Sequence, residues 1–307
     1  MNFELPKRSK RIQGNNMHLK KSIEKAKQQR EAAQRTVAVD LFAQERAEAP
    51  VSKETSADSP ENTEVAEDAF RKWTSPVYRQ SRPMELDLNK LTQNRLVCMF
   101  PDAPEAEYYK VLRANIQRRT RLKKWNTIMI TSVQPREGKT LTSINLALSF
   151  ARELNHTVLL VDCDLRRQSI CRYLNFPGDK GIIDYLENDC ALKDIIIWPN
   201  IDKLTLISGR RITSHSSELI GSPKMRALVD EMKNRYDDRY LIFDVPPIMS
   251  GADAIAFAPM TDCIIMVVEE GRTSVDEVKK ALEMIPAEKF IGFVLNRSTA
   301  PMSRYYY

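Results

Sequence analysis

The sequence predicts an α/β protein with a mostly parallel central sheet, helices on both faces, and a flexible N-terminal region ahead of it. Two observations carry this prediction. Short apolar runs that are continuous rather than alternating are separated by helix-length segments, as is typical of strands buried on both faces of a parallel sheet. The N-terminal part is instead strongly charged. With 307 residues, 42% of them hydrophobic, the chain is long enough for one large domain or two small ones.

The N-terminal region changes charge along its length. Residues 1–37 carry ten Lys or Arg against three Glu, whereas residues 40–70 carry nine Asp or Glu against two Lys or Arg. The acidic stretch has almost no large apolar side chains and is predicted to be disordered. The basic stretch fits a solvated helix, and the sequence leaves open whether a partner or an anionic lipid contacts it. We therefore predict a charged, largely disordered region over 1–74 and an extended arm over 75–104.

From residue 105 the predicted elements alternate. A helix is predicted over 105–122, followed by a strand at 127–132, a helix at 140–154 and a strand at 157–165. Further predicted strands lie at 203–209, 240–247, 263–271 and 290–297. Together they define a domain over 105–298, followed by a flexible tyrosine-rich tail over 299–307.

Composition excludes several classes of protein. Five scattered cysteines without a C-x-x-C pair, and only three histidines, argue against a disulfide framework or structural zinc and favour a reducing cytosol. We find neither an apolar run of about 18 to 20 residues nor a secretory h-region. A net charge of +6 is mild, so no nucleic-acid partner is expected. A dehydrogenase is disfavoured, because no G-x-G-x-x-G follows the first domain strand.

The stretch TSVQPREGKT, residues 131–140, ends like a phosphate-binding loop between a strand and a helix. In such loops, backbone N–H groups and a helix N-terminus surround the phosphates, a Lys reaches the β- and γ-phosphates, and a Ser or Thr binds Mg²⁺. Lys139 and Thr140 have these places, although the full pattern would have glycine at Val133. The residues predicted to contact the nucleotide are Pro135, Arg136, Glu137, Gly138, Lys139, Thr140 and Leu141.

Three carboxylates follow predicted strands. Asp162 and Asp164 end one buried strand, and Asp244 ends another. A single strand-end aspartate is usually a helix cap or a turn residue. Beside a phosphate-binding loop, however, such carboxylates can hold Mg²⁺, directly or through water, or accept a proton from an attacking hydroxyl. The combination favours a P-loop NTPase-like domain that uses ATP and Mg²⁺.

These segments resemble the Walker A, A′ and B motifs of bacterial tyrosine kinases, most closely the cytoplasmic autokinases of exopolysaccharide loci. The resemblance rests on GKT, on LLVDCDLR at 159–166 and on DVPP at 244–247, and it covers about residues 75–307. It implies that Lys139 binds phosphates and that Thr140, Asp162 and Asp244 hold Mg²⁺. It also makes Asp162 the catalytic base, with Asp164 in a supporting role. Asn296 resembles an adenine-reading residue, with an ordinary polar strand end as the alternative.

The resemblance also implies an assembly. Glu107, Lys110 and Arg113 match an E-x-x-R-x-x-R oligomerisation motif, with lysine at its middle basic position. Relatives with this motif form homo-oligomers, including rings, so we expect self-association here. A membrane-embedded activator of the polysaccharide chain-length type is expected as the partner. The expected location is the cytoplasm, at the inner face of the plasma membrane.

The sequence ends in Tyr305, Tyr306 and Tyr307. Either these residues form a small hydrophobic docking tip, or, as the resemblance implies, they are the phosphoacceptors of an autokinase. Each phosphate adds about −1.5 to −2 charge, so a fully modified tail would carry roughly −5. We expect such a tail to be repelled from an acidic nucleotide site.

Two other functions compete with the tyrosine autokinase. A Min/Par-like switch ATPase would share the fold, but its signature lysine is replaced here by Gln134. A nucleotide-binding scaffold with weakened catalysis is suggested by Arg136, which stands where related kinases have glycine. If this position requires φ > 0, a non-glycine residue costs about 1–2 kcal/mol. We therefore expect weaker ATP binding than in the variant Arg136→Gly.

Overall fold

The computed structural model describes residues 82–83, 86–100, 102–153, 155–176, 180–236 and 238–299. All of them belong to one unit of the chain, residues 70–307. The predicted N-terminal region, 1–74, lies outside the described residues, as does all but the first residue of the predicted tail.

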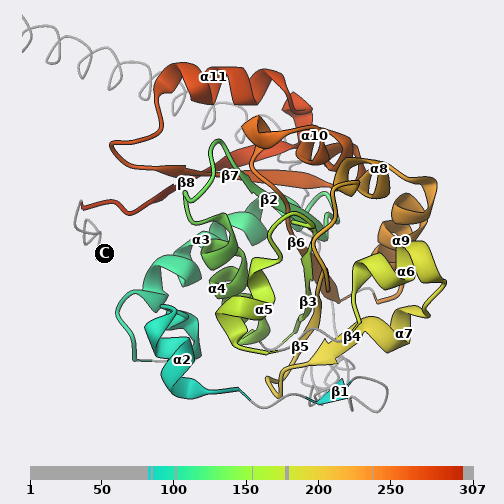
Figure 1. Ribbon diagram of the computed structural model, residues 1–307. Helices are drawn as coiled ribbons and strands as arrows, with labels where there is room; N and C mark the ends of the chain where they lie inside the picture. The colour runs from blue at the N-terminus through green and yellow to red at the C-terminus, as the bar shows by residue number, and fades with distance from the viewer. Residues whose placement is uncertain are drawn as a thin grey trace, which may run out of the picture. The chain divides into compact units, whose positions relative to one another are not determined.

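One sheet organises the described residues, and its strand order is β1-β4-β5-β3-β6-β2-β7-β8 (Figure 1). Neighbouring strands are parallel except for β4 and β5, which pair antiparallel. The strands are β1 (Arg82–Pro83), β2 (Thr127–Ser132), β3 (Thr157–Asp162), β4 (Ile196–Trp198), β5 (Leu204–Ile207), β6 (Arg239–Asp244), β7 (Cys263–Glu269) and β8 (Phe290–Asn296). The predicted α/β class with a mostly parallel sheet is confirmed.

Helices cover both faces of this sheet (Figure 1). One face carries α2 (Leu88–Gln93), α3 (Ala106–Thr120), α4 (Lys139–Ala151) and α5 (Ser169–Leu174). The other carries α6 (Ile182–Asn188), α7 (Leu192–Ile195), α8 (Ser216–Ile220), α9 (Pro223–Asn234), α10 (Asp253–Phe257) and α11 (Val275–Glu283). Short 3₁₀ turns complete the connections: η2 (Val97–Met99), η3 (Ile248–Ser250), η4 (Ala258–Met260) and η5 (Ala287–Lys289).

The central strands supply both hydrophobic cores. Along β2, Ile128 and Ile130 join the core under α4, whereas Met129 joins the opposite core, and all three are completely buried. Successive side chains of a strand point to opposite faces, so a run that is apolar at every position must be covered on both sides. This is the physical reason why continuous rather than alternating apolar runs predicted the fold.

The extended arm predicted over 75–104 is wrong for residues 88–99, which form α2 and η2. Asp87 caps α2 by accepting hydrogen bonds from the backbone N–H groups of Asn89, at 3.0 Å, and Lys90, at 3.2 Å. Leu91 and Leu96 are completely buried against the α4 face. An N-cap and two buried leucines therefore turn this stretch into part of the domain.

Among the residues that the structure describes, we find no helix with the length and apolarity needed to cross a membrane.

The strand register brings the polar strand ends together. Asp162, at the end of β3, lies opposite Asp244 at the end of β6, and Ile130 of β2 lies opposite Asp244 on its other side. Because β2 leads directly into the loop before α4, this loop and both carboxylates share the carboxyl edge of the sheet. In open α/β sheets, this edge is where ligands bind.

Candidate functional site

The loop between β2 and α4 contains two residues with left-handed backbone. Gly138 has φ 93° and Arg136 has φ 71°. The positive φ of Gly138 favours glycine, and a Cβ atom there would lie 2.0 Å from Nδ2 of Asn296 and would displace that side chain. Asn296 itself donates a hydrogen bond from Nδ2 to the carbonyl oxygen of Glu137, at 2.7 Å. The end of β8 thus holds the loop.

Glu137 ties the loop down from inside. Its buried carboxylate accepts a hydrogen bond from the backbone N–H of Gln134, at 2.7 Å, and another from the hydroxyl of Thr273. Burial raises the pKa of Glu137, and these two donors oppose the rise. Gln134 is also engaged through its side chain, which donates to Glu277 on α11 at 2.9 Å. The predicted contact residue Glu137 therefore shapes the loop.

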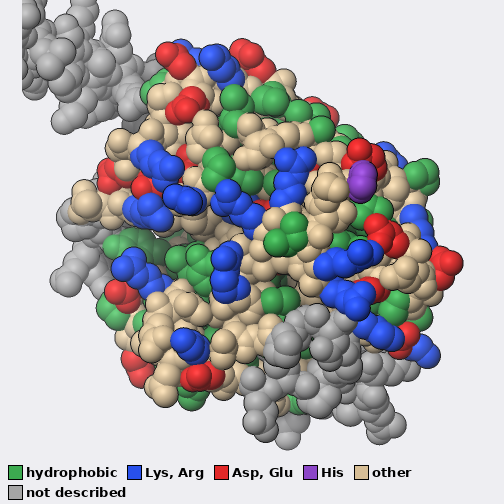
Figure 2. Space-filling model, in the orientation of Figure 1, with side chains coloured by type: hydrophobic (Ala, Val, Ile, Leu, Met, Phe, Trp, Pro, Cys, Tyr) green, Lys and Arg blue, Asp and Glu red, His purple; other side chains and the backbone are tan. Residues whose placement is uncertain are grey.

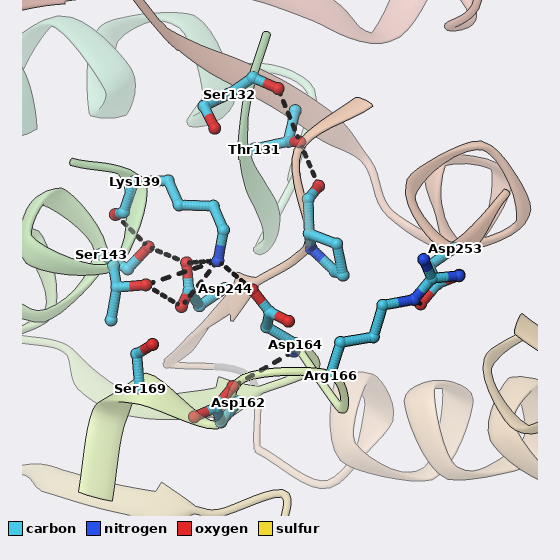
Figure 3. A network of polar contacts seen from close by, with 12 residues as sticks. Thr131, Ser132, Lys139, Ser143, Asp162, Asp164, Arg166, Ser169, Asp244 and Asp253 are labelled. Atoms are coloured by element: carbon cyan, nitrogen blue, oxygen red, sulfur yellow. Dashed lines mark hydrogen bonds and ion pairs between the residues drawn. The ribbon is translucent and has the colours of Figure 1, made fainter. Parts of the chain in front are cut away.

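Lys139, the first residue of α4, points its ammonium group at two carboxylates (Figure 3). Nζ lies 2.8 Å from Oδ2 of Asp164 and 3.3 Å from each carboxylate oxygen of Asp244. Burial alone would lower the pKa of Lys139, but the carboxylates of Asp244 and Asp164 outweigh that effect and raise it. The ammonium is thus held in its charged form inside the protein.

Asp244 is the meeting point of the cluster. Its Oδ2 accepts a hydrogen bond from the hydroxyl of Thr140 at 2.6 Å, and its Oδ1 accepts one from Ser143 at 3.2 Å. Burial raises its pKa, while the neighbouring Lys139 opposes the rise. Ser143 was not predicted, although it follows Lys139 by four residues and so lies on the same face of α4.

Asp162 lies beside this cluster and is bound to backbone. Its carboxylate accepts the N–H groups of Asp164, at 3.1 Å, and Ile170, at 3.0 Å. Burial, together with the nearby Asp244 carboxylate, raises the pKa of Asp162 to about 8. Perturbed carboxylates of this kind are typical of functional sites.

In the described part of the chain, no three Asp, Glu, His or Cys side chains converge so as to hold a metal by themselves. Mg²⁺ rarely needs such a cage, because it usually takes one or two carboxylates together with substrate phosphates and water. The Thr140 hydroxyl next to the Asp244 carboxylate fits this mode of binding. The residues present therefore suit a divalent ion that arrives with a phosphate ligand.

A cavity of about 530 Å³ opens in front of the loop. Most predicted site residues line it, whereas Glu137, Asp162 and Asp244 do not, so these three carboxylates lie behind the cavity wall. The lining residues among those predicted are Pro135, Arg136, Gly138, Lys139, Thr140, Leu141, Asp164 and Asn296. Five arginines also line the cavity: Arg95, Arg136, Arg167, Arg172 and Arg297. Four of these were not predicted, because they come from separate parts of the chain, Arg172 from α5 and the others from connecting segments, that only the fold brings together.

Arg166 points away from the Lys139 cluster (Figure 3). Its guanidinium pairs with Asp253, with Nη2 at 2.8 Å from Oδ1, and donates to the hydroxyls of Ser216 and Ser217. It thereby links the loop after β3 to α8 and α10. No contact had been predicted for this residue.

The three residues of the predicted oligomerisation motif lie on α3 but differ in direction. Glu107 and Lys110 are exposed and pair with each other at 2.9 Å. Arg113 is mostly covered: it pairs with Glu153 at 3.2 Å and donates to the carbonyl oxygen of Ser149 in α4. Its guanidinium therefore binds α4 of its own chain. The predicted acceptors Tyr305, Tyr306 and Tyr307 lie outside the described residues.

Comparison with known proteins identifies a family model and several relatives that this chain matches. A family model described as an AAA domain matches residues 126–290, more than half of the chain. The chain is 32% identical to the tyrosine-protein kinase CpsD of Streptococcus agalactiae serotype Ia over 202 residues, 65% of this chain and 85% of the relative. It is 29% identical to the tyrosine-protein kinase YwqD of Bacillus subtilis over 210 residues, covering 68% and 87%.

A solved structure agrees. The chimerical protein CapA2B2 superposes with a TM-score of 0.61 at 29% identity, covering 76% of this chain and 98% of the other. The chain therefore belongs to the AAA domain family and, within it, to the nucleotide-binding bacterial tyrosine-protein kinases.

Proposed function

We propose that this protein transfers the γ-phosphoryl group of ATP to tyrosine, with its own Tyr305, Tyr306 and Tyr307 as acceptors, and so regulates exopolysaccharide synthesis and export. In this reaction the phenol oxygen forms a bond to the γ-phosphorus, and the bond to the β,γ-bridging oxygen breaks. ADP leaves, and the phenol proton passes to a carboxylate. The observation that carries the proposal is the ammonium of Lys139, held against Asp164 and Asp244 at the back of an arginine-lined cavity.

Within this proposal Lys139 and the backbone of the loop bind the phosphates. The N-terminus of α4 adds its unpaired N–H groups and its positive dipole end. Thr140 and Asp244, with support from Asp162 and Asp164, would hold Mg²⁺, which neutralises charge developing on the phosphoryl oxygens. We propose Asn296 as a residue at the adenine, because it borders the cavity at the end of β8.

We propose Asp162 as the base that takes the tyrosine proton. A tyrosine hydroxyl has a pKa near 10, so a base of raised pKa matches it better than an ordinary aspartate does. The pKa of Asp162, about 8, fits this requirement for the ionised carboxylate, which becomes the main form only above about pH 8. Asp162 lies behind the cavity wall, however, whereas Asp164 lines the cavity. Comparing kcat against pH for Asp162→Asn and Asp164→Asn tests the assignment, and an unchanged profile in Asp162→Asn would overturn it.

The direct test of the function is incubation of the full chain with Mg·ATP, followed by mass spectrometry of the C-terminal peptide. We expect phosphate on Tyr305, Tyr306 or Tyr307, and none in Lys139→Met. Unchanged autophosphorylation after deletion of residues 305–307 would show that the acceptors lie elsewhere. A switch ATPase would instead release inorganic phosphate without modifying the chain. Gln134, at the position of that class's signature lysine, is bound to α11.

We also propose self-association through the exposed part of α3, with a membrane-embedded activator as partner and the inner face of the plasma membrane as location. The exposed pair Glu107 and Lys110 supports a contact surface there. Light scattering of the purified chain, with and without phosphorylation, tests the assembly. Fractionation of cells with and without the membrane-embedded activator tests whether that partner recruits this protein to the membrane.

A further inference from the structure

A second cavity, of about 380 Å³, adjoins the nucleotide cavity. The two share Pro135, Arg136 and Arg167 as common wall, and Arg272 lines only the second one. Lys and Arg side chains gather near the centre of the face shown in Figure 2. The shared residues therefore include two cations, Arg136 and Arg167, that line both cavities.

The two arginine side chains of the common wall have no partner among the described residues. Among the described residues, the guanidinium groups of Arg136 and Arg167 make no hydrogen bond and no ion pair, and both side chains are exposed. Arg272 pairs with Glu269 at 3.1 Å. Unpaired guanidinium groups present a planar fork of donors that matches a phosphate group.

The two carboxylates of the second cavity already have donors. Glu137 accepts from the backbone of Gln134 and from Thr273. Glu277 accepts from the backbone N–H of Ser274 at 2.9 Å, as part of the capping box of α11, and from the side chain of Gln134. An anion that enters the cavity therefore meets carboxylates that already have donors, together with the unpaired guanidinium groups of Arg136 and Arg167.

We propose that this second cavity binds the phosphate of a phosphotyrosine that neighbours the acceptor tyrosine, in the tail of this chain or of a second copy. The proposal rests on the proposed tyrosine-kinase function. The tail is singled out because its three tyrosines are consecutive. Consecutive Cα atoms are about 3.8 Å apart, so a neighbour of the acceptor stays close to the reacting centre. The shared wall places the second cavity directly beside the nucleotide cavity.

The consequence is that one phosphorylation favours the next. It also revises the expectation that a modified tail is repelled from an acidic site. Asp244 and Asp162 lie behind the cavity wall, and Asp164, the carboxylate that lines the cavity, is paired with Lys139, whereas five arginines line the same cavity. A partly phosphorylated tail is therefore a better ligand than an unmodified one.

Binding of peptides tests the site without relying on turnover. The full chain is saturated with Mg²⁺ and adenylyl imidodiphosphate, so that the γ-phosphate position is filled. Fluorescent peptides of residues 298–307, unmodified or with one phosphotyrosine, are then titrated in by anisotropy. We expect the phosphopeptide to bind about tenfold more tightly, as two charge-assisted contacts at an exposed site allow. Equal binding of the two peptides would overturn the proposal. A preference for the phosphopeptide that is seen only without the nucleotide analogue would also overturn it, because the phosphotyrosine phosphate would then be occupying the γ-phosphate position.

Variants assign the preference to the cavity. Arg167→Gln and Arg272→Gln should each reduce the ratio of the two affinities several-fold. Arg95→Gln is the matched control, because Arg95 lines the nucleotide cavity but not the second one. An equal loss of preference in Arg95→Gln would indicate a general charge effect and contradict the assignment.

Kinetics separate this proposal from the proposed function. With Mg·ATP, the ratio of kcat/KM for the phosphopeptide to that for the unmodified peptide should exceed one and fall in Arg272→Gln. If neither peptide is phosphorylated but the phosphopeptide still binds preferentially, the kinase proposal fails and the phosphate site stands. If both peptides are phosphorylated at equal kcat/KM and bind equally, the site fails and the kinase proposal stands.

Discussion

Arg136 offers the sharpest test of how the loop works. Its φ of 71° confirms that the position is left-handed, where a side chain other than glycine costs about 1–2 kcal/mol. Replacement by glycine removes this cost but adds backbone freedom to the unfolded chain, worth about 0.5–1 kcal/mol. Arg136→Gly should therefore raise the free energy of unfolding by about 0.5–1 kcal/mol, or about 2 °C in Tm for a domain of this size.

The effect on ATP binding has a different origin. The loop has φ 71° without a nucleotide, so strain that is present in both the free and the bound protein cancels from the affinity. What Arg136→Gly loses is an unpaired guanidinium in the cavity wall, worth about 0.2–1 kcal/mol at an exposed site. We therefore expect about 1.4- to fivefold weaker ATP binding in the variant. This reverses the expectation from sequence alone, in which the cost of backbone strain outweighed the help of the arginine charge.

Arg136→Ala separates the two effects, because it keeps the strain and removes the charge. Urea unfolding should place Arg136→Gly above both Arg136→Ala and the natural chain in stability. Isothermal titration with Mg·ATP should give the two variants similar affinities, both below that of the natural chain, with a difference that shrinks as salt rises. Tighter ATP binding by Arg136→Gly than by the natural chain would refute this reasoning and show that backbone strain, rather than the guanidinium charge, controls the affinity.

Three further predictions concern stability. Gly138→Ala should lower the free energy of unfolding by about 2 kcal/mol or more, because of the φ of 93° and because the new Cβ displaces Asn296. In a double-mutant cycle with Asn296→Ala, the sum of the two single costs should exceed the cost of the double variant by about 1 kcal/mol. Strict additivity in urea unfolding would contradict the contact between the two residues. Because the folded-state pKa of Asp162, about 8, lies above its unfolded value near 3.9, the native state binds more protons between these limits. Unfolding free energy, measured with chelator and without nucleotide, should therefore fall as pH rises through this window, and Asp162→Asn should flatten the slope. Arg113→Ala should lower the free energy of unfolding by about 1–2 kcal/mol, because it loses its contacts with Glu153 and with Ser149 of α4. The control Glu107→Ala should change the free energy of unfolding by no more than about 0.5 kcal/mol, because Glu107 is exposed. Matching urea midpoints for the two variants would argue against this difference.

Much of the fold could be predicted because its strands are apolar at every position. The runs around Ile128, Leu159 and Ile242 admit one reading, a sheet buried on both faces, and the structure confirms it. The antiparallel pair of β4 and β5 and the helix α2 were not predicted. Both depend on tertiary packing: the short strand β4 pairs with β5 over two positions, and α2 buries Leu91 against the α4 face.

The site could be predicted where its chemistry is local and not where it depends on register. The loop residues Lys139 and Thr140, and each strand-end aspartate, are visible in the sequence. That Asp162 lies directly opposite Asp244 follows only from the pairing of β3 with β6 and from the register of that pair. The direction of Arg113, toward α4 rather than outward, likewise requires the packing of two helices.

The position of Lys139 couples the binding of the nucleotide to the binding of the metal ion. To reach a phosphate, its ammonium must turn away from Asp164 and Asp244, which are both buried. Buried carboxylates left without a cation are costly, commonly by about 3–5 kcal/mol when one partner of a buried pair is removed. A ligand that supplies its own divalent ion replaces the lost charge, whereas the free nucleotide does not. We therefore expect ATP to bind at least tenfold more tightly with Mg²⁺ than with chelator, and comparable affinities in isothermal titration would show that Lys139 keeps its carboxylate partners when the nucleotide is bound.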